Sequence, residues 1–166
     1  MGSTEDNLKD AFSGESQASQ KYRSFAERAE EEGKPQVAKL FRAASAGEMV
    51  HARCHLRSMK GVGTTEENLT EAIEGENYEY TEMYPKFVEA AKEEGHKDAR
   101  LCFNYAMRVE KMHEGHYQRA LEAVQSDEDL QETRYFVCQV CGNLEEEAPE
   151  KCPVCGNPKE MFSEIE

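Results

Sequence analysis

The chain has 166 residues, of which 38% are hydrophobic and 33% are charged, and its formal net charge is −14. The acidic balance argues against nucleic acid as a partner, because binding phosphates requires a basic surface. No segment approaches the ~20 apolar residues of a membrane span, and the N-terminus lacks the basic and apolar regions of a signal peptide. We therefore expect a cytoplasmic protein without a membrane partner, large enough for one bundle and a small appendage.

Four segments show helical periodicity, with apolar residues recurring every three or four positions. Their approximate bounds are residues 4–32, 35–60, 65–95 and 97–124. Gly33 and Gly95 end the first and third segments, and Pro35 suits the first turn of the second. Pro85 lies inside the third segment, where we expect it to kink the helix. This pattern predicts an all-α, four-helix bundle.

A shift of 62 residues aligns the two halves of the predicted bundle. Glu15 aligns with Glu76 when the shift is reduced by one residue. The counterpart of Glu79 is Gln17, which cannot supply a carboxylate. The bundle is therefore predicted to be a doubled helical hairpin with one extra acidic group in its second half. The residues that align directly are Tyr22 with Tyr84, Phe25 with Phe87, Phe41 with Phe103, Glu48 with Glu110, and His51 with His113.

Glutamate and histidine side chains fall on inward-facing positions of all four helices. A Glu and a His three residues apart on a helix project in the same direction, and unpaired carboxylates in a core are costly. Two divalent cations would offset the repulsion among these carboxylates. The pattern predicts a two-metal carboxylate centre, with iron or manganese favoured by the mixed oxygen and imidazole ligands. The predicted ligands are Glu15, Glu48, His51, Glu76, Glu79, Glu110 and His113.

Within this centre we expect Glu48 and Glu110 to bridge the metals and Glu15 and Glu79 to be terminal ligands. Two roles remain open for Tyr22 and Tyr84, namely orienting the terminal carboxylates through their hydroxyls and packing in the core. The remaining histidines are expected at the surface or behind the ligands, and the two isolated cysteines are expected to be small buried hydrophobic residues. These residues are His55, His96, His116, Cys54 and Cys102.

Two copies of a Cys-x-x-Cys-Gly-Asn knuckle follow a polar stretch after the fourth helix. Glycine allows positive φ, so that backbone N–H groups can donate to the thiolates. A tail of about 32 residues cannot build a sufficient core without a metal, and disulfides are the alternative. The predicted thiolate ligands are Cys138, Cys141, Cys152 and Cys155. The spacing suits zinc or iron, and a redox dimetal neighbour that needs electrons favours iron.

The predicted domains are a bundle at residues 1–126, a linker at 127–134 and a metal-knuckle domain at 135–166. The chain resembles the rubrerythrin family over nearly its full length. The motifs that carry the resemblance are Gly14-Glu15-Ser16, Glu48-x-x-His51, Gly75-Glu76-x-x-Glu79, Met83-Tyr84-Pro85, Glu110-x-x-His113 and the two Cys-x-x-Cys pairs. The resemblance implies a ferritin-like four-helix bundle with a di-iron centre, fused to a rubredoxin-like domain that holds one iron on its four cysteines.

The resemblance also implies an activity, namely a non-haem di-iron peroxidase that reduces hydrogen peroxide to water in defence against oxidative stress. Electrons would come ultimately from NADH through a partner reductase or a rubredoxin and would return singly through the thiolate-bound iron. The chain itself carries no Gly-x-Gly-x-x-Gly fingerprint for NADH. The resemblance further implies that one iron exchanges Glu79 for His51 on reduction.

Two other functions stay open: a ferroxidase or iron-handling protein, and a non-catalytic metal-binding scaffold with zinc in the tail. The assembly is predicted from the short link between the second and third helices. The family fold places these helices parallel, so the chain must return ~30 Å, whereas Gly61–Thr64 covers at most ~14 Å. We therefore predict a homodimer with swapped helix pairs, and an antiparallel arrangement within one monomer is the alternative.

Overall fold

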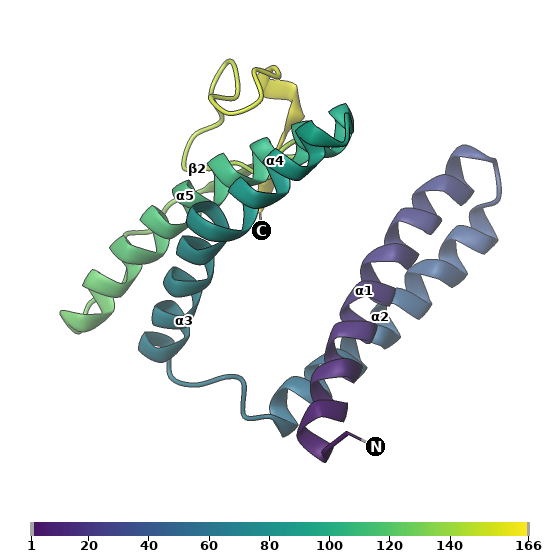
Figure 1. Ribbon diagram of the computed structural model, residues 1–166, viewed down its shortest axis with the longest axis horizontal. Helices are drawn as coiled ribbons and strands as arrows, with labels where there is room; N and C mark the ends of the chain where they lie inside the picture. The colour runs from purple at the N-terminus through teal and green to yellow at the C-terminus, as the bar shows by residue number, and fades with distance from the viewer. Residues whose placement is uncertain (1, 166) are drawn as a thin grey trace. The chain divides into compact units, whose positions relative to one another are not determined.

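The computed structural model describes residues 2–165, which form two compact units with a boundary between Gly63 and Thr64. The first unit is a hairpin of two long helices, and the second combines further helices with a small C-terminal sheet (Figure 1). No helix within residues 2–165 has the length and hydropathy needed to cross a membrane.

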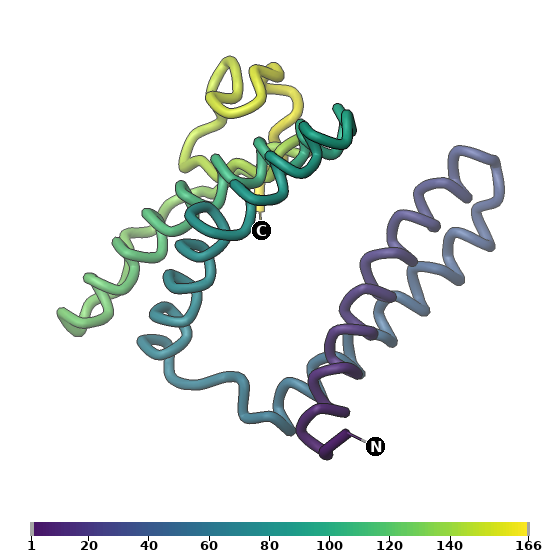
Figure 2. The backbone as a smooth tube through the Cα atoms, viewed as in Figure 1, coloured from purple at the N-terminus to yellow at the C-terminus, as the bar shows by residue number. Residues whose placement is uncertain are grey.

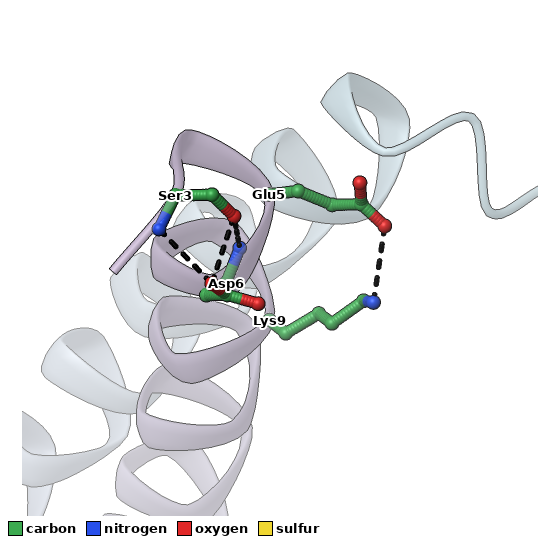
Figure 3. A network of polar contacts seen from close by, with 4 residues as sticks. All are labelled: Ser3, Glu5, Asp6 and Lys9. Atoms are coloured by element: carbon green, nitrogen blue, oxygen red, sulfur yellow. Dashed lines mark hydrogen bonds and ion pairs between the residues drawn. The ribbon is translucent and has the colours of Figure 1, made fainter.

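The first unit consists of α1 (Thr4–Glu31) and α2 (Pro35–Ser58). Helix α1 begins with a capping box, in which Ser3 Oγ accepts from the Asp6 N–H at 3.1 Å and the Asp6 carboxylate accepts from the Ser3 N–H at 3.0 Å (Figure 3). An ion pair between Lys9 and Glu5 at 3.1 Å supports the next turn. These groups satisfy N–H donors that a helix start otherwise leaves unpaired.

Small residues allow α1 and α2 to approach closely. Ser19 and Ser45 are buried where the helices meet, and they exchange hydrogen bonds, with Ser45 Oγ donating to the Ser19 carbonyl at 2.8 Å and Ser19 Oγ to the Ser45 carbonyl at 3.1 Å. Their buried neighbours along the hairpin are all alanines. These are Ala26, Ala29, Ala38 and Ala52. Phe41 packs against three of these alanines, whereas Phe25 is 47% exposed.

The second unit contains α3 (Thr65–Tyr78), a π-helical segment η1 (Glu79–Met83), α4 (Tyr84–Glu93) and α5 (Lys97–Gln125). The expected third helix is therefore present in three consecutive pieces, and its axis changes direction between α3 and α4 (Figure 1), as expected from Pro85 in the first turn of α4. The Tyr84 N–H donates to the Glu79 carbonyl, five residues back. The wider π turn ends at the start of α4, whose first turn contains Pro85, a residue without an N–H.

The C-terminal module is a three-stranded antiparallel sheet of β1 (Tyr135–Cys138), β2 (Leu144–Glu145) and β3 (Phe162–Ile165), in the order β2-β1-β3. A 3-10 turn, η2 (Lys159–Met161), precedes β3. The module, drawn in yellow, lies against α5 (Figure 2). Val109 of α5 is only 2% exposed because it packs against Cys138, Cys152 and Val154 of the module. The cysteine knuckles therefore sit directly on the helix that carries Glu110 and His113.

Two aromatic clusters confirm the predicted repeat. Tyr22 and Phe41 have ring centroids 6.2 Å apart with an interplanar angle of 38°, and their counterparts Tyr84 and Phe103 show the same two values. The third ring of each cluster repeats as well, since Phe25–Phe41 and Phe87–Phe103 are 5.6 and 5.5 Å apart. The two halves of the chain thus place equivalent side chains in equivalent local surroundings.

The expectation that Cys54 and Cys102 are buried is wrong, because both are exposed. Cys54 is two residues from buried Ala52, about 200° around the helix, and so faces the opposite side. Cys102 lies seven residues before Val109 on nearly the same face of α5. The C-terminal module covers that face at Val109 and leaves it open at Cys102.

Candidate metal centres

The first candidate metal cluster joins both helices of the first unit. Glu15 comes from α1, and Glu48 and His51 come from consecutive turns of α2. His51 Nδ1 lies 2.9 Å from Glu48 Oε2 and 3.8 Å from Glu15 Oε1. We call these three residues the first triad. Its ligand atoms all lie within 4.8 Å of one another, so they can converge on a single ion.

The second triad repeats this geometry in the second unit with Glu76 of α3 and Glu110 and His113 of α5. His113 Nδ1 lies 2.9 Å from Glu110 Oε2 and 3.7 Å from Glu76 Oε1. The corresponding distances in the two triads agree within 0.1 Å. The sequence repeat is therefore also a repeat of ligand geometry.

These distances fit a transition-metal ion. Two ligand atoms about 2.1 Å from an ion and at right angles to each other are roughly 3.0 Å apart. The 2.9 Å spacing between imidazole and carboxylate in each triad matches neighbouring ligands, and the spacings of 3.7 and 3.8 Å match a wider angle. Each triad supplies one imidazole and two carboxylates, which is the donor set that iron accepts.

The metal-free second triad is electrostatically unfavourable. Burial, followed by the nearby charge of Glu110, raises the pKa of Glu76 from its usual 4.5 to about 7. The hydrogen bond to Glu110 raises the pKa of His113, although burial opposes that shift. Protons therefore bind to the carboxylate and imidazole groups that a metal cation would otherwise neutralise. The cation must displace these protons when it binds.

Glu79 lies beside the second triad rather than within its three-residue cluster. Burial and the charge of Glu110 raise the pKa of Glu79, so its carboxylate faces the same acidic surroundings. It is the first residue of the π segment η1, which places it at a local irregularity of the helix. Such π turns occur often at functional sites, and the first half, with Gln17 at this position, continues as a regular α-helix.

A polar network that the sequence did not reveal ties η1 to α5. Glu114 accepts a hydrogen bond from Asn77 Nδ2 and another from the Tyr80 hydroxyl, each at 2.9 Å. Asn77 Nδ2 also donates to the Tyr80 hydroxyl at 3.1 Å. Since Asn77 and Tyr80 flank Glu79, this network holds the turn that presents Glu79.

Tyrosines surround the second triad. Burial, and then the charge of Glu79, raises the pKa of Tyr84, so its hydroxyl keeps its proton beside the carboxylates. Burial, and then the charges of Glu76 and Glu110, raise the pKa of Tyr117 as well. Tyr22 lies in its aromatic cluster. Orientation of terminal carboxylates by Tyr22 and Tyr84 stays a prediction.

The four predicted thiolate ligands converge in the C-terminal module. Cys138 Sγ and Cys155 Sγ are 3.7 Å apart, and Cys141 Sγ and Cys152 Sγ are 3.5 Å apart. A disulfide would require about 2.05 Å, and all four cysteines are free. Sulfurs about 2.3 Å from the centre of a tetrahedron are roughly 3.8 Å apart, so the spacing fits one tetrahedral metal ion.

The two knuckles have the predicted backbone turn. Gly142 and Gly156 adopt φ values of +82° and +75°, and each donates its N–H to the carbonyl of the first cysteine of its knuckle, at 2.8 and 2.9 Å. Backbone N–H groups reach the sulfurs, among them that of Asn157, whose side chain also donates to Cys155 Sγ at 3.2 Å. Burial disfavours the Cys155 thiolate, but the Asn157 donors, together with hydrogen bonds from Cys152 and Cys141, outweigh it and lower the pKa of Cys155 to about 6.

Contacts from α5 join the second triad to the cysteine module. The His113 ring is hydrogen-bonded to the backbone of Gly142, the residue after Cys141. His116, expected at the surface or behind the ligands, is half-buried, with Nε2 3.3 Å from the Leu144 carbonyl and Nδ1 2.6 Å from Arg119 Nη2. Arg119 in turn pairs with Glu146 at 3.0 Å. Of the other two histidines, His96 is exposed, as expected of a surface residue, and His55 is half-buried.

Comparison with known proteins identifies the family. The model of the rubrerythrin domain matches residues 6–121, and that of the rubrerythrin rubredoxin-like domain matches residues 136–163. The chain belongs to the rubrerythrin family. Among rubrerythrin-family relatives, it is 34% identical to nigerythrin of Nitratidesulfovibrio vulgaris, over 98% of this chain and 87% of that protein. It is also 34% identical to a rubrerythrin of Porphyromonas gingivalis, over 96% and 88%.

Solved structures of rubrerythrin-family proteins agree. Nigerythrin in its fully reduced, all-ferrous state has a TM-score of 0.58 and 32% identity, covering 99% of this chain and 88% of the other. The ferritin-like helical fold with a rubredoxin-like C-terminal domain is therefore confirmed. So are the cofactors, a di-iron centre in the rubrerythrin domain and one iron in the rubredoxin-like domain. The domain bounds and individual ligands stay proposals.

Proposed function

We propose that this protein is a peroxidase that reduces hydrogen peroxide to water. Rubrerythrin-family proteins generally act as peroxidases against oxidative stress, and membership of this family supports the proposal. The observation that carries it is the matched geometry of the two triads, one of which is hydrogen-bonded to the cysteine module. The proposed di-iron ligands are Glu15, Glu48, His51, Glu76, Glu79, Glu110 and His113.

Two electrons and two protons convert hydrogen peroxide into two molecules of water. When bound, the two ferrous ions supply these electrons. The carboxylates and imidazoles of the two triads would hold the ions, and Glu79 of η1 would add its carboxylate beside the second triad. The protonated Tyr84 hydroxyl supplies a hydrogen-bond donor next to these anionic ligands.

We also propose that Cys138, Cys141, Cys152 and Cys155 hold the iron through which electrons return. The hydrogen bond between the His113 ring and the Gly142 backbone supports this proposal, because it joins a di-iron ligand to the first knuckle within one chain. The reductant would be a separate redox protein, a rubredoxin or an NADH-dependent reductase. A cytoplasmic location is part of this proposal.

A swapped homodimer is our proposal for completing the di-iron centre. Backbone hydrogen bonds from Met59, Lys60 and Gly61 to the last turn of α2 fold the chain back there, so only residues 61–64 are extended, over at most ~14 Å. The helical stretches from His51 to Ser58 and from Thr65 to Glu76 together rise about 27 Å. If α2 and α3 are parallel in the bundle, as we propose, this link is too short to join them within one bundle.

Steady-state assays with a supplied electron donor would test the peroxidase proposal. We expect turnover with hydrogen peroxide to be much faster than with oxygen, and we expect no accumulation of iron mineral. Substituting Glu110→Ala and His113→Ala together should abolish peroxide turnover while the visible bands of the thiolate-bound iron persist. Faster turnover with oxygen, together with mineral formation, would instead favour the ferroxidase alternative.

A further inference from the structure

Arg108 on α5 binds the backbone of the second knuckle through both arms of its guanidinium group. Its Nη1 donates to the Val154 carbonyl at 2.5 Å, and its Nη2 donates to the Pro153 carbonyl at 2.7 Å. Pro153 and Val154 are the two residues between Cys152 and Cys155. The guanidinium group of Arg108 therefore contacts the two-residue segment that separates two of the proposed thiolate ligands.

The same two peptide groups face the metal site on their other side. The N–H groups of Val154 and Cys155 both donate to the Cys152 sulfur. The Val154 N–H shares a peptide group with the Pro153 carbonyl, and the Cys155 N–H shares one with the Val154 carbonyl. Arg108 thus binds the oxygen of each peptide group whose N–H binds sulfur, and such chains of hydrogen bonds polarise one another.

The internal repeat indicates that this contact is not a requirement of the bundle. In α2 the position equivalent to Arg108 is Ala46, and the position equivalent to Val109 is Gly47. Arg108 and Val109 both contact the cysteine module, with Val109 packed against Cys138 and Cys152. The residues that distinguish α5 from α2 here are therefore residues that bind the module.

We propose that Arg108 is a positioning residue that raises the reduction potential of the thiolate-bound iron by polarising the two peptide groups that donate to Cys152. The inference depends on the proposed four-thiolate iron site. An iron with four thiolates has a net charge of −1 when ferric and −2 when ferrous, so one added electron increases the negative charge. A cation and strengthened N–H donors stabilise the more negative form.

The test is the reduction potential of the iron-loaded, full-length protein, followed through its thiolate-to-iron visible bands in a titration with redox mediators. We expect Arg108→Gln to lower the equilibrium constant for reduction by up to about tenfold, or about 59 mV for a one-electron couple. Arg108→Lys keeps the charge but lacks the planar fork, so we expect a smaller decrease. The measurement needs no peroxide, so it is independent of the peroxidase proposal.

Arg119→Gln is the matched control, because it removes the same charge from the same helix. Arg119 binds the Glu146 side chain and His116 rather than a knuckle carbonyl, so we expect the potential to stay at the wild-type value. The proposal is overturned if Arg108→Gln leaves the potential unchanged, or if Arg119→Gln lowers it as much. If Arg108→Gln fails to retain iron, Arg108→Lys decides, and a wild-type potential in that variant overturns the proposal.

Discussion

The two triads share their internal distances but differ in exposure. The His51 side chain is 59% exposed, whereas His113 is 25% exposed and is bonded to Gly142 of the cysteine module. Because desolvation is the largest cause of the raised pKa of Glu76, negative charge on the second triad is unfavourable when no cation offsets it. We therefore expect metal binding to stabilise the second triad.

The raised pKa of Glu76 predicts how the metal-free protein responds to pH. Between the ordinary pKa of 4.5 and the folded-state value of about 7, the folded state binds more protons than the unfolded state. The contribution of Glu76 to the stability of the folded state is therefore complete below pH 4.5 and is lost as pH rises through about 7. The raised pKa of His113 acts in the same direction.

Urea unfolding of the metal-free protein at several pH values measures this effect. We expect the free energy of unfolding to decline from pH 4.5 to 7, and we expect Glu76→Gln to remove part of that decline. A decline of the same size in the Gln variant would show that Glu76 is not responsible.

Glu79 is the proposed ligand that has no counterpart in the first half of the chain. We expect Glu79→Gln to reduce peroxide turnover by at least about tenfold, because removing even a supporting group at a metal site has effects of about 10- to 100-fold. Glu82→Gln is a matched control in the same π segment, since Glu82 is exposed and pairs with Lys86 at 2.9 Å. Equal effects of the two substitutions would contradict a special role for Glu79.

At the level of single residues, the repeat and the Glu-x-x-His motifs were sufficient to select the residues of both triads. Arg108 and Glu114 escaped prediction because their roles depend on which element α5 packs against. Arg108 contacts the cysteine module and Glu114 contacts the segment around η1. Neither residue belongs to a local sequence motif. A single sequence does not show which elements pack together when they lie so far apart in the chain.

Among the secondary-structure elements, η1 is the one that distinguishes the two halves most clearly. Pro85 predicted a disturbance of the third helix, and the disturbance takes the form of a π turn from Glu79 to Met83. Sequence periodicity could not reveal the π geometry, because one wide turn shifts the apolar pattern only slightly. The hydrogen bonds of Glu114 with Asn77 and Tyr80 are visible only in three dimensions.

We expect Tyr80→Phe to loosen the π turn, since it removes the hydroxyl that donates to Glu114. Amide hydrogen exchange at residues 80–84 should accelerate by roughly 2- to 10-fold, the range expected for one lost hydrogen bond. Tyr78→Phe is the control, because Tyr78 precedes the turn and is 57% exposed. Unchanged exchange in Tyr80→Phe would mean that Glu114 does not hold the turn.

For the whole molecule, the helix positions and the knuckle turns were predicted well because caps, glycines and prolines mark them locally. The assembly is less determined by sequence, since it depends on how the two compact units of different chains meet. The proposed swap depends on the short extended link at residues 61–64. Its consequence is that each di-iron centre draws one triad from each chain.

Mixing two inactive variants tests the swap. One chain would carry Glu48→Ala and His51→Ala, and the other Glu110→Ala and His113→Ala. In a swapped homodimer, co-expression yields heterodimers in which one centre is intact, so about a quarter of wild-type activity should return for random pairing. In an unswapped bundle every centre is damaged, and no recovery would occur.

We propose that the triads and the four cysteines form one redox unit that reduces peroxide. The most direct measurement mixes the anaerobically reduced protein with one equivalent of hydrogen peroxide and follows the visible bands of the oxidised thiolate-bound iron in a stopped-flow instrument. We predict that these bands appear rapidly in the wild type and much more slowly with the Glu110→Ala, His113→Ala variant. Equally fast appearance in that variant would contradict the account, because electrons would then leave the thiolate-bound iron without passing the triads.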